Sequence, residues 1–328
     1  MKKILLIITL ISSFMLIGCS KLHEKSGQVF SMATTVEVKL YGENKDILNQ
    51  AYEEVITIYN DINKLADAYL EYDGINNVYT INNSKKPVVI KNTLFELLFE
   101  SNRLKIETKG HFNPFLGRLN LIYKTIINKG SEVTLDDIPD DKAIENELEI
   151  ANNTYLIFDE LNSTVTKIGD GLIDLGAIAK GYATRKAKEI IKKYDIQEYI
   201  VNAGQSSISL GRHPGKDYFT VGAYGVNDFK LEVVNSDIAT SSVDMQKVTF
   251  NNTVYHHIID PFTGSPTNLY DTILVIGDNS CILDCLSTAF MCMTYDDILK
   301  ISKEFDVNAF VFKDNMLIYS TSEARTYE

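Results

Sequence analysis

The sequence predicts a single α+β body in which mixed sheets are flanked by helices. Stretches with the two-residue alternation of strands and stretches with a helical period follow one another irregularly, unlike the regular series of a doubly wound fold. No low-complexity tract, heptad run or repeat interrupts the 328 residues. Single α+β units reach this length. We therefore expect one compact, two-lobed body over residues 28–328.

The first part of the chain predicts a strand followed by two helices. Residues 28–41 alternate between polar and apolar side chains, as a half-buried strand does. A second helix is expected over residues 93–109, stopped by Gly110. Between them, residues 47–65 carry one apolar stripe with the period of a helix, formed by Ala51, Val55, Ile58, Ile62 and Leu65.

The middle of the chain predicts surface helices, a hairpin and a buried helix. Residues 120–152 are expected to be partly helical and to face solvent, and an acidic cluster around Pro139 is expected to be a solvated loop. Residues 155–159 and 164–168 predict a hairpin. A strand that ends at Asp174 then leads into a helix over residues 177–194.

The last part of the chain predicts the remaining strands and one short apolar helix. That helix is expected over residues 283–293, and residues 307–312 are expected to close the sheet. The other strands are expected at residues 199–202, 207–210, 219–224, 229–234, 247–250 and 272–276.

The amino terminus predicts export and lipid anchoring. Lys2 and Lys3 precede an apolar run at residues 4–17, which is shorter than the about 20 residues of a membrane-spanning helix. The run ends in Leu-Ile-Gly-Cys19, which has the form of a bacterial lipobox. We expect a signal peptide over residues 1–18, acylation of Cys19 and a polar tether over residues 19–27. A short membrane anchor is the alternative, and the expected location is the extracytoplasmic face of the cell membrane.

Charge and cysteine spacing exclude several other classes. Removal of the two lysines of the signal peptide changes the formal net charge from −12 to −14, which argues against nucleic acid as a partner. Cys281, Cys285 and Cys292 match neither paired zinc knuckles nor a CxxC motif. Because their spacing puts them on one helical face, we expect them to be small buried side chains in a core.

Residues 171–183 predict a candidate site for an anion. A strand runs through Gly176 directly into a helix, so unpaired backbone N–H groups at the helix start can receive an anion. Lys180 stands one turn into that helix. A phosphate-bearing ligand and an ordinary turn with a surface lysine are equally compatible with this segment alone.

Two further segments carry candidate chemistry. His256 and His257 precede a turn at residues 260–264, and an imidazole beside an anion site can serve as a base or a phosphate partner; a structural histidine is the alternative. Asp284 and Thr288 share a helical face inside an apolar segment. Two oxygen donors suit a hard cation such as Mg²⁺. The alternative to metal binding is that Asp284 caps the start of its helix.

Taken together, the order and spacing of these motifs resemble the ApbE family of flavin transferases over nearly all of the mature sequence. The matching segments are Met32-Ala33-Thr34, residues 72–82, Gly110-His-Phe-Asn-Pro114, residues 174–183, Asn202-Ala-Gly204, Ala239-Thr-Ser241, residues 257–264 and residues 284–288.

The resemblance implies a T-fold-related body and an FAD:protein FMN transferase, which joins FMN to a threonine or serine hydroxyl of an acceptor such as a subunit of a membrane redox pump. It implies that Mg²⁺ is held by the Ala177 carbonyl, Asp284 and Thr288. It also implies that FAD, as substrate, is lined by Met32, Tyr72, Phe112, Asn113, Asp174, Lys180, His257 and Ile258.

Within this site we expect chemical roles for His257, Lys180 and Asp284. His257 is the candidate for proton abstraction from the acceptor, Lys180 adds positive charge, and Asp284 holds the metal. An FAD pyrophosphatase that yields FMN and AMP, and a non-catalytic FAD-binding lipoprotein, are the alternatives. The chain departs from the family pattern at Ala33, Asn113, Gln205 and Ser242.

Overall fold

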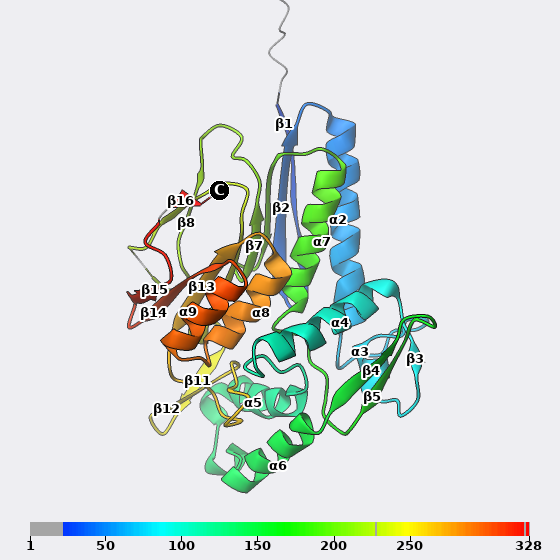
Figure 1. Cartoon of the computed structure of the whole chain (residues 1–328), viewed down its shortest axis with the longest axis vertical. Helices are drawn as coiled ribbons and strands as arrows, with labels where there is room; N and C mark the ends of the chain where they lie inside the picture. Colours follow the sequence, from blue (N-terminus) through cyan, green and yellow to red (C-terminus); the bar gives the residue numbers. More distant parts are fainter. Residues whose placement is uncertain (1–21, 227, 325, 328) are drawn as a thin grey trace, which may run out of the picture.

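An eight-stranded antiparallel sheet forms the centre of the molecule in this computed structural model, which describes residues 22–226, 228–324 and 326–327 (Figure 1). The first two strands form a hairpin, and the last two form the opposite edge. In spatial order the strands are β1 (His23–Ser31), β2 (Thr34–Gly42), β6 (Glu198–Ala203), β7 (Ser207–Leu210), β10 (Asp237–Ser242), β13 (Thr272–Gly277), β14 (Asn308–Lys313) and β15 (Met316–Ser320).

Helices cover one face of this sheet (Figure 1). Asn44 caps the long first helix by accepting from the amides of Asp46 and Ile47, and Asn279 caps α8 in the same way. Inward side chains of β2 and β6 pack against these helices in one large core. The helices are α2 (Lys45–Ala66), α7 (Ala179–Lys193), α8 (Ser280–Phe290) and α9 (Tyr295–Glu304).

A small three-stranded sheet covers part of the opposite face. It has the order β16-β9-β8 and packs on Leu274, Ile276 and Phe310 in a second, smaller core. Since it is narrow, Ile200 and Ile208 on the same face are only partly buried. Its strands are β8 (Phe219–Val221), β9 (Leu231–Val233) and β16 (Thr326–Tyr327), and β11 (Lys247–Phe250) and β12 (Thr253–His256) form a separate hairpin.

A second lobe lies below the large sheet in Figure 1. Its buried side chains, such as Leu94, Leu119 and Val165, belong to the same core as the helices above, so the two lobes share one hydrophobic interior. Its elements are α3 (Val78–Asn82), α4 (Asn92–Glu107), α5 (Gly117–Lys129), α6 (Asp141–Asn152), β3 (Val88–Val89), β4 (Tyr155–Asp159) and β5 (Thr164–Ile168), with short 3₁₀ turns at Gly130–Glu132 and Leu135–Asp137. A further 3₁₀ turn, Val243–Met245, follows β10 beside the large sheet.

The α+β prediction is confirmed, with corrections to its detail. The sheets are antiparallel rather than mixed, apart from the short parallel pair β9 and β16. The expected strand at 28–41 is a hairpin, because Met32 and Ala33 form a two-residue turn. Residues 23–27 of the expected tether belong to β1, since they pair with residues 38–42. Cys19 and the signal peptide lie outside the described residues.

Other elements differ from the sequence prediction where tertiary packing outweighs the local pattern. Tyr59 rather than Ile58 is buried on the stripe of α2. Strand β10 was not expected, since its six buried residues do not alternate in polarity, and neither was α9. Strand β15, rather than 307–312, ends the large sheet. The three described cysteines are free and buried, as expected.

Candidate functional site

A cleft of about 1200 Å³ opens where the two lobes meet the end of the large sheet. Such a volume exceeds the range of about 300–1,000 Å³ that is usual for small-ligand pockets, which suits a dinucleotide-sized ligand. The cleft brings together ten of the residues expected from the sequence, namely Met32, Phe112, Asn113, Asp174, Ala177, Lys180, His257, Ile258, Asp284 and Thr288.

The close crossing of α7 and α8 builds the floor of the cleft. The Gly181 amide donates to Asp284 Oδ2 at 2.8 Å instead of to the Ala177 carbonyl four residues earlier, where a regular helix would place it. In the part of the chain that the structure describes, no backbone amide bonds to the Ala177 carbonyl. This carbonyl therefore remains available to a ligand in the cleft.

Only glycine fits at position 181. A Cβ atom there would lie 2.2 Å from the Ser280 carbonyl oxygen and 2.4 Å from Asp284 Cβ. We expect Gly181→Ala to force α7 and α8 apart and to lower the free energy of unfolding by about 1–3 kcal/mol, measured by urea denaturation. Gly215→Ala is the control, because a Cβ atom there meets nothing within 4 Å. Equal stability of the two variants would contradict this packing.

Asp284 is a buried carboxylate with very few partners. Its side chain is only 3% exposed, and burial raises the pKa of its carboxyl, with Lys180 and the Gly181 amide opposing the rise. The described residues offer it no hydrogen-bond donor besides Gly181. Burial of so poorly paired a charge is costly, and a bound cation would offset that cost. Asn279 caps α8, so the alternative of Asp284 as the cap is wrong.

Thr288 lies one turn further along α8 and completes this set of oxygen atoms. Its hydroxyl lies 3.1 Å from Ser241 Oγ, and it donates to the Asp284 carbonyl at 3.4 Å. Ser241 in turn lies 2.8 Å from Ser287 Oγ. The donor chemistry of Ala177, Asp284 and Thr288 fits a hard cation, which prefers oxygen ligands.

The three expected metal donors do not form a cluster of His, Cys, Asp or Glu side chains. Within residues 22–226, 228–324 and 326–327, no group of three or more His, Cys, Asp or Glu side chains could hold a metal ion. The expected set contains one carboxylate, one hydroxyl and one carbonyl. Mg²⁺ commonly takes one or two carboxylates beside the phosphates of its ligand.

The polar wall near the start of α7 carries Lys180 and Asp174. Lys180 Nζ donates to the Gly176 carbonyl at 3.1 Å, at the rim of the cleft. Asp174 accepts from the Gly176 amide at 2.8 Å and from the Tyr69 hydroxyl at 2.6 Å. These contacts fix the turn that leads into the helix.

Tyr69, rather than Tyr72, lines the cleft. The Tyr72 hydroxyl donates to Asp67 at 3.0 Å and lies outside the lining, because Asp67 ends α2 and holds this loop in place. The motif at 72–82 also has a structural function: Asn82 exchanges two hydrogen bonds with the backbone of Ile173, at 2.8 and 3.0 Å. No periodic pattern marks Tyr69 in the sequence.

The two adjacent histidines have different surroundings. His256 is buried, with Nε2 2.6 Å from the Thr267 carbonyl and Nδ1 accepting from the Ile258 amide at 3.3 Å, so its ring is held by the backbone. His257 lines the cleft, with Nδ1 3.4 Å from the Gln246 carbonyl. Burial lowers the pKa of His257 to about 4. His257 is therefore a neutral acceptor at pH 7, whereas His256 has a structural function.

This lowered pKa predicts a measurable titration. We expect the His257 imidazole to stay neutral at pH 6 and to titrate near pH 4 in NMR spectra, assigned by loss of its resonance in His257→Gln. Because the unfolded chain takes up this proton near pH 6.5 and the folded chain does not, His257 lowers stability as the pH falls from 6.5 to about 4. His257→Gln should lose less stability over that range, and a midpoint near 6.5 would contradict the burial.

The remaining expected residues form the apolar and backbone parts of the wall. Phe112, Asn113 and Ile258 are buried, and Asn113 accepts from the Phe115 amide at 3.1 Å. The Met32 amide donates to Asn63 at 2.9 Å, which anchors the hairpin turn at the cleft. His111, which is not among the predicted site residues, also lines the cleft and packs edge-on against Phe262.

The α+β fold brings a buried carboxylate, a lysine and an imidazole together around one ligand-sized space. A model of the ApbE family matches residues 32–311. The chain belongs to the ApbE family.

Named relatives and solved structures agree with this assignment. The chain is similar to the FAD:protein FMN transferases of Chlamydia muridarum (25% identical, covering 75% of this chain and 76% of the relative) and Treponema pallidum (24% identical, covering 90% and 87%). Its fold is similar to that of the ApbE protein of Thermotoga maritima (TM-score 0.74, 23% identity, covering 88% and 94%) and of the flavin transferase ApbE of Vibrio cholerae (0.72, 20%, 92% and 98%).

Proposed function

We propose that the chain is an FAD:protein FMN transferase, which moves FMN from FAD to a threonine or serine hydroxyl of an acceptor protein and releases AMP. Family membership supports the activity. The observation that carries the assignment of the site is the diverted Gly181 amide, which leaves the Ala177 carbonyl available beside Asp284 and Thr288 in the cleft.

The residues of the cleft suit this phosphoryl transfer. The acceptor oxygen forms a bond to the phosphorus of the FMN half, the bond from that phosphorus to the bridging oxygen breaks, and AMP leaves with the electron pair. His257, neutral at pH 7, takes the proton of the acceptor hydroxyl. Lys180 lies at the rim and contributes positive charge to the diphosphate.

Asp284, Thr288 and the Ala177 carbonyl would hold Mg²⁺. When bound, this ion would neutralise charge on the diphosphate. The three donors come from the turn that precedes α7 and from α8, and the close approach of the two helices at Gly181 keeps these segments together.

Incubation of the protein with FAD, Mg²⁺ and a candidate acceptor, followed by mass spectrometry, tests the proposal. We expect an acceptor that gains the mass of the FMN group on one threonine or serine, together with equimolar AMP. Free FMN and AMP with an unmodified acceptor would instead identify a pyrophosphatase. Tight FAD binding with no AMP would identify a binding protein.

We further propose that Cys19 is acylated and holds the enzyme at the extracytoplasmic face of the cell membrane, where its acceptor is a membrane redox-pump subunit or a similar protein. The lipobox and the signal peptide support this location. No helix among the described residues is both long enough and apolar enough to span a bilayer.

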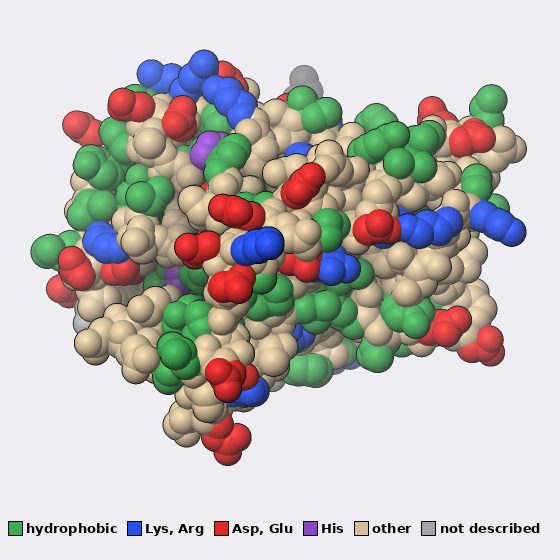
Figure 2. Space-filling model, turned by 90° about the horizontal axis from the view of Figure 1, so that it is seen from below, with side chains coloured by type: hydrophobic (Ala, Val, Ile, Leu, Met, Phe, Trp, Pro, Cys, Tyr) green, Lys and Arg blue, Asp and Glu red, His purple; other side chains and the backbone are tan. Residues whose placement is uncertain are grey.

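Acidic and basic side chains are interspersed on the face seen from below (Figure 2), and the net charge of −12 does not favour nucleic acid as a partner.

A further inference from the structure

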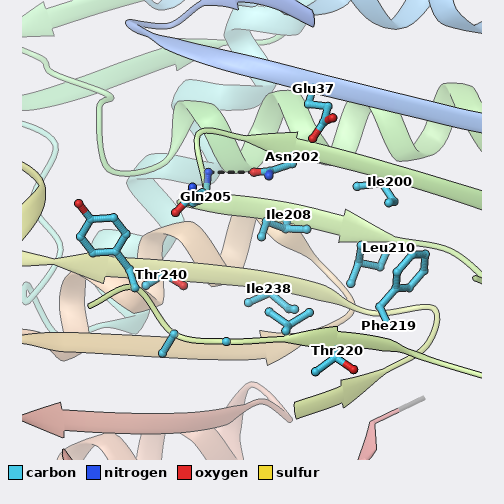
Figure 3. A pocket seen from close by; sticks show the side chains of 14 residues that line it. Glu37, Ile200, Asn202, Gln205, Ile208, Leu210, Phe219, Thr220, Ile238 and Thr240 are labelled. Carbon is cyan, nitrogen blue, oxygen red and sulfur yellow. Dashed lines mark hydrogen bonds between the residues drawn. The ribbon is translucent and has the colours of Figure 1, made fainter. Parts of the chain in front are cut away.

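A second cavity, of about 460 Å³, adjoins the cleft on the face of the large sheet away from α7 and α8. Five residues line both spaces, namely Glu37, Asn202, Gln205, Tyr224 and Thr240. Figure 3 shows the polar residues Asn202, Gln205 and Thr240 gathered at one end and Leu210 and Phe219 at the other. The polar end is therefore the end that joins the cleft.

The middle of this cavity is aliphatic and incompletely covered. Ile200 on β6 and Ile208 on β7 point into it (Figure 3) and are only partly buried. Val221 on β8 lies in the opposite wall and is also partly buried. The small sheet is too narrow to cover these side chains, so a groove remains between it and the large sheet.

The wall formed by residues 219–224 contains strand β8, which has a free edge. Among the described residues, β8 pairs with β9 and with no second strand. An unpaired edge exposes backbone N–H and C=O groups in register for another strand. Extended peptides are commonly recognised by addition to such an edge, with pockets that accept alternate side chains.

We propose that this groove binds an extended segment of the acceptor protein along the edge of β8 and delivers its threonine or serine into the cleft past Gln205 and Thr240. This inference rests on the proposed transferase activity. The continuity of the two spaces supports it, because an acceptor hydroxyl has to reach the phosphate-binding part of the cleft from outside.

Gln205 stands at the junction of the two spaces. Its φ of 63° is left-handed, a strained backbone conformation for a residue other than glycine. The backbone amide of Gln205 donates to Asn202 Oδ1 at 2.8 Å. The exposed side-chain carboxamide of Gln205 makes no hydrogen bond to a described residue, so it is free to bond to the main chain of an incoming segment.

The geometry predicts which acceptors fit. A strand rises about 3.3 Å per residue, and its side chains alternate between two faces. An acceptor bound along the three-residue strand β8 therefore places every second side chain on the aliphatic wall. We expect aliphatic residues two and four positions away from the modified hydroxyl residue, on one side of it.

A pool of synthetic peptides, each with one central threonine and randomised flanks, tests this site directly. The peptides are incubated with the enzyme, FAD and Mg²⁺, and the flavinylated members are isolated by their fluorescence and sequenced. The wild type is expected to select aliphatic residues at alternate positions. A modified pool without that alternation would overturn strand addition at β8.

Two variants block the groove without touching the expected metal donors. We expect Ile208→Arg on β7 and Thr220→Arg on β8, two residues that line the groove and not the cleft, to lower kcat/KM for selected peptides by about tenfold or more through KM, with the Kd for FAD unchanged within about twofold. Ile157→Arg, on the half-exposed strand β4 outside both cavities, is the matched control. Thermal unfolding checks that each variant is folded.

The outcomes separate this inference from the function on which it rests. Unchanged peptide kinetics in both folded groove variants would overturn the docking site and leave the transferase intact. If FAD affinity fell as much as peptide kcat/KM, the groove would belong to the nucleotide site, and the proposed docking site would also be overturned. Failure of the wild type to modify any peptide while it releases AMP from FAD would overturn both the transferase activity and the acceptor groove.

Discussion

Asp284→Ala is expected to lower the rate of FMN transfer by on the order of a thousandfold, measured as flavin incorporated into the acceptor at saturating FAD and Mg²⁺. The carboxylate is the only charged donor in the expected metal set, and it lies at the floor of the cleft. Removal of this charge leaves one hydroxyl and one carbonyl, which bind a divalent ion weakly.

Asparagine at the same position separates chemistry from folding. Asp284→Asn keeps an oxygen that can accept from the Gly181 amide, so the fold should be unchanged or more stable, because a buried charge is removed. Transfer should still be lost. Asp296→Ala, an exposed carboxylate in the first turn of α9, is the control and should keep full activity. A fully active Asp284→Asn variant would contradict the metal-binding function assigned to Asp284.

Lys188→Met is expected to lower the free energy of unfolding by about 3–5 kcal/mol, as the loss of one partner of a buried ion pair does. Lys188 Nζ lies 3.0 Å from Asp237 Oδ1 and donates to the Asp278 carbonyl at 3.0 Å. Asp237 is fully buried and also accepts from Ser209 at 2.6 Å and from the Ser280 amide at 2.9 Å. The variant leaves this carboxylate buried without its cation.

A second lysine of the same helix provides the control. Lys193 pairs with Glu54 at 3.0 Å on the surface, with its side chain 64% exposed, so Lys193→Met should change stability very little. Urea denaturation of both variants tests the difference. Similar stability of Lys188→Met and the wild type would show that the Asp237 network does not hold the start of α8 against α7.

Much of this molecule could be predicted from local sequence patterns. The hairpin Tyr155–Asp159 with Thr164–Ile168 has the predicted bounds, because alternation and turn residues act over a few positions. Helix α7 also lies within two residues of its expected ends. The expected oxygen donors line one cleft because Ala177 lies in the turn before α7, and Asp284 and Thr288 lie one turn apart on α8, which crosses α7 at Gly181.

The remaining features depend on contacts between distant segments. The buried strand β10 has no alternation, since both of its faces are covered. The diversion of the Gly181 amide requires α8 to cross α7 at that residue, and a glycine in a helix does not by itself reveal such an approach. Tyr69 reaches the cleft because Asp174, more than one hundred positions away in the sequence, accepts its hydroxyl. Tyr72, which belongs to the recognisable motif, bonds to nearby Asp67 instead.

A crystal structure of the protein with FAD and Mn²⁺ in place of Mg²⁺ would test the central claim most directly, because the anomalous signal of manganese locates the ion independently of the protein atoms. We expect one peak within coordination distance of the Asp284 carboxylate, the Thr288 hydroxyl and the Ala177 carbonyl, against the diphosphate of FAD. A nucleotide bound elsewhere, or a manganese peak remote from these three oxygen atoms, would contradict the assignment of this cleft.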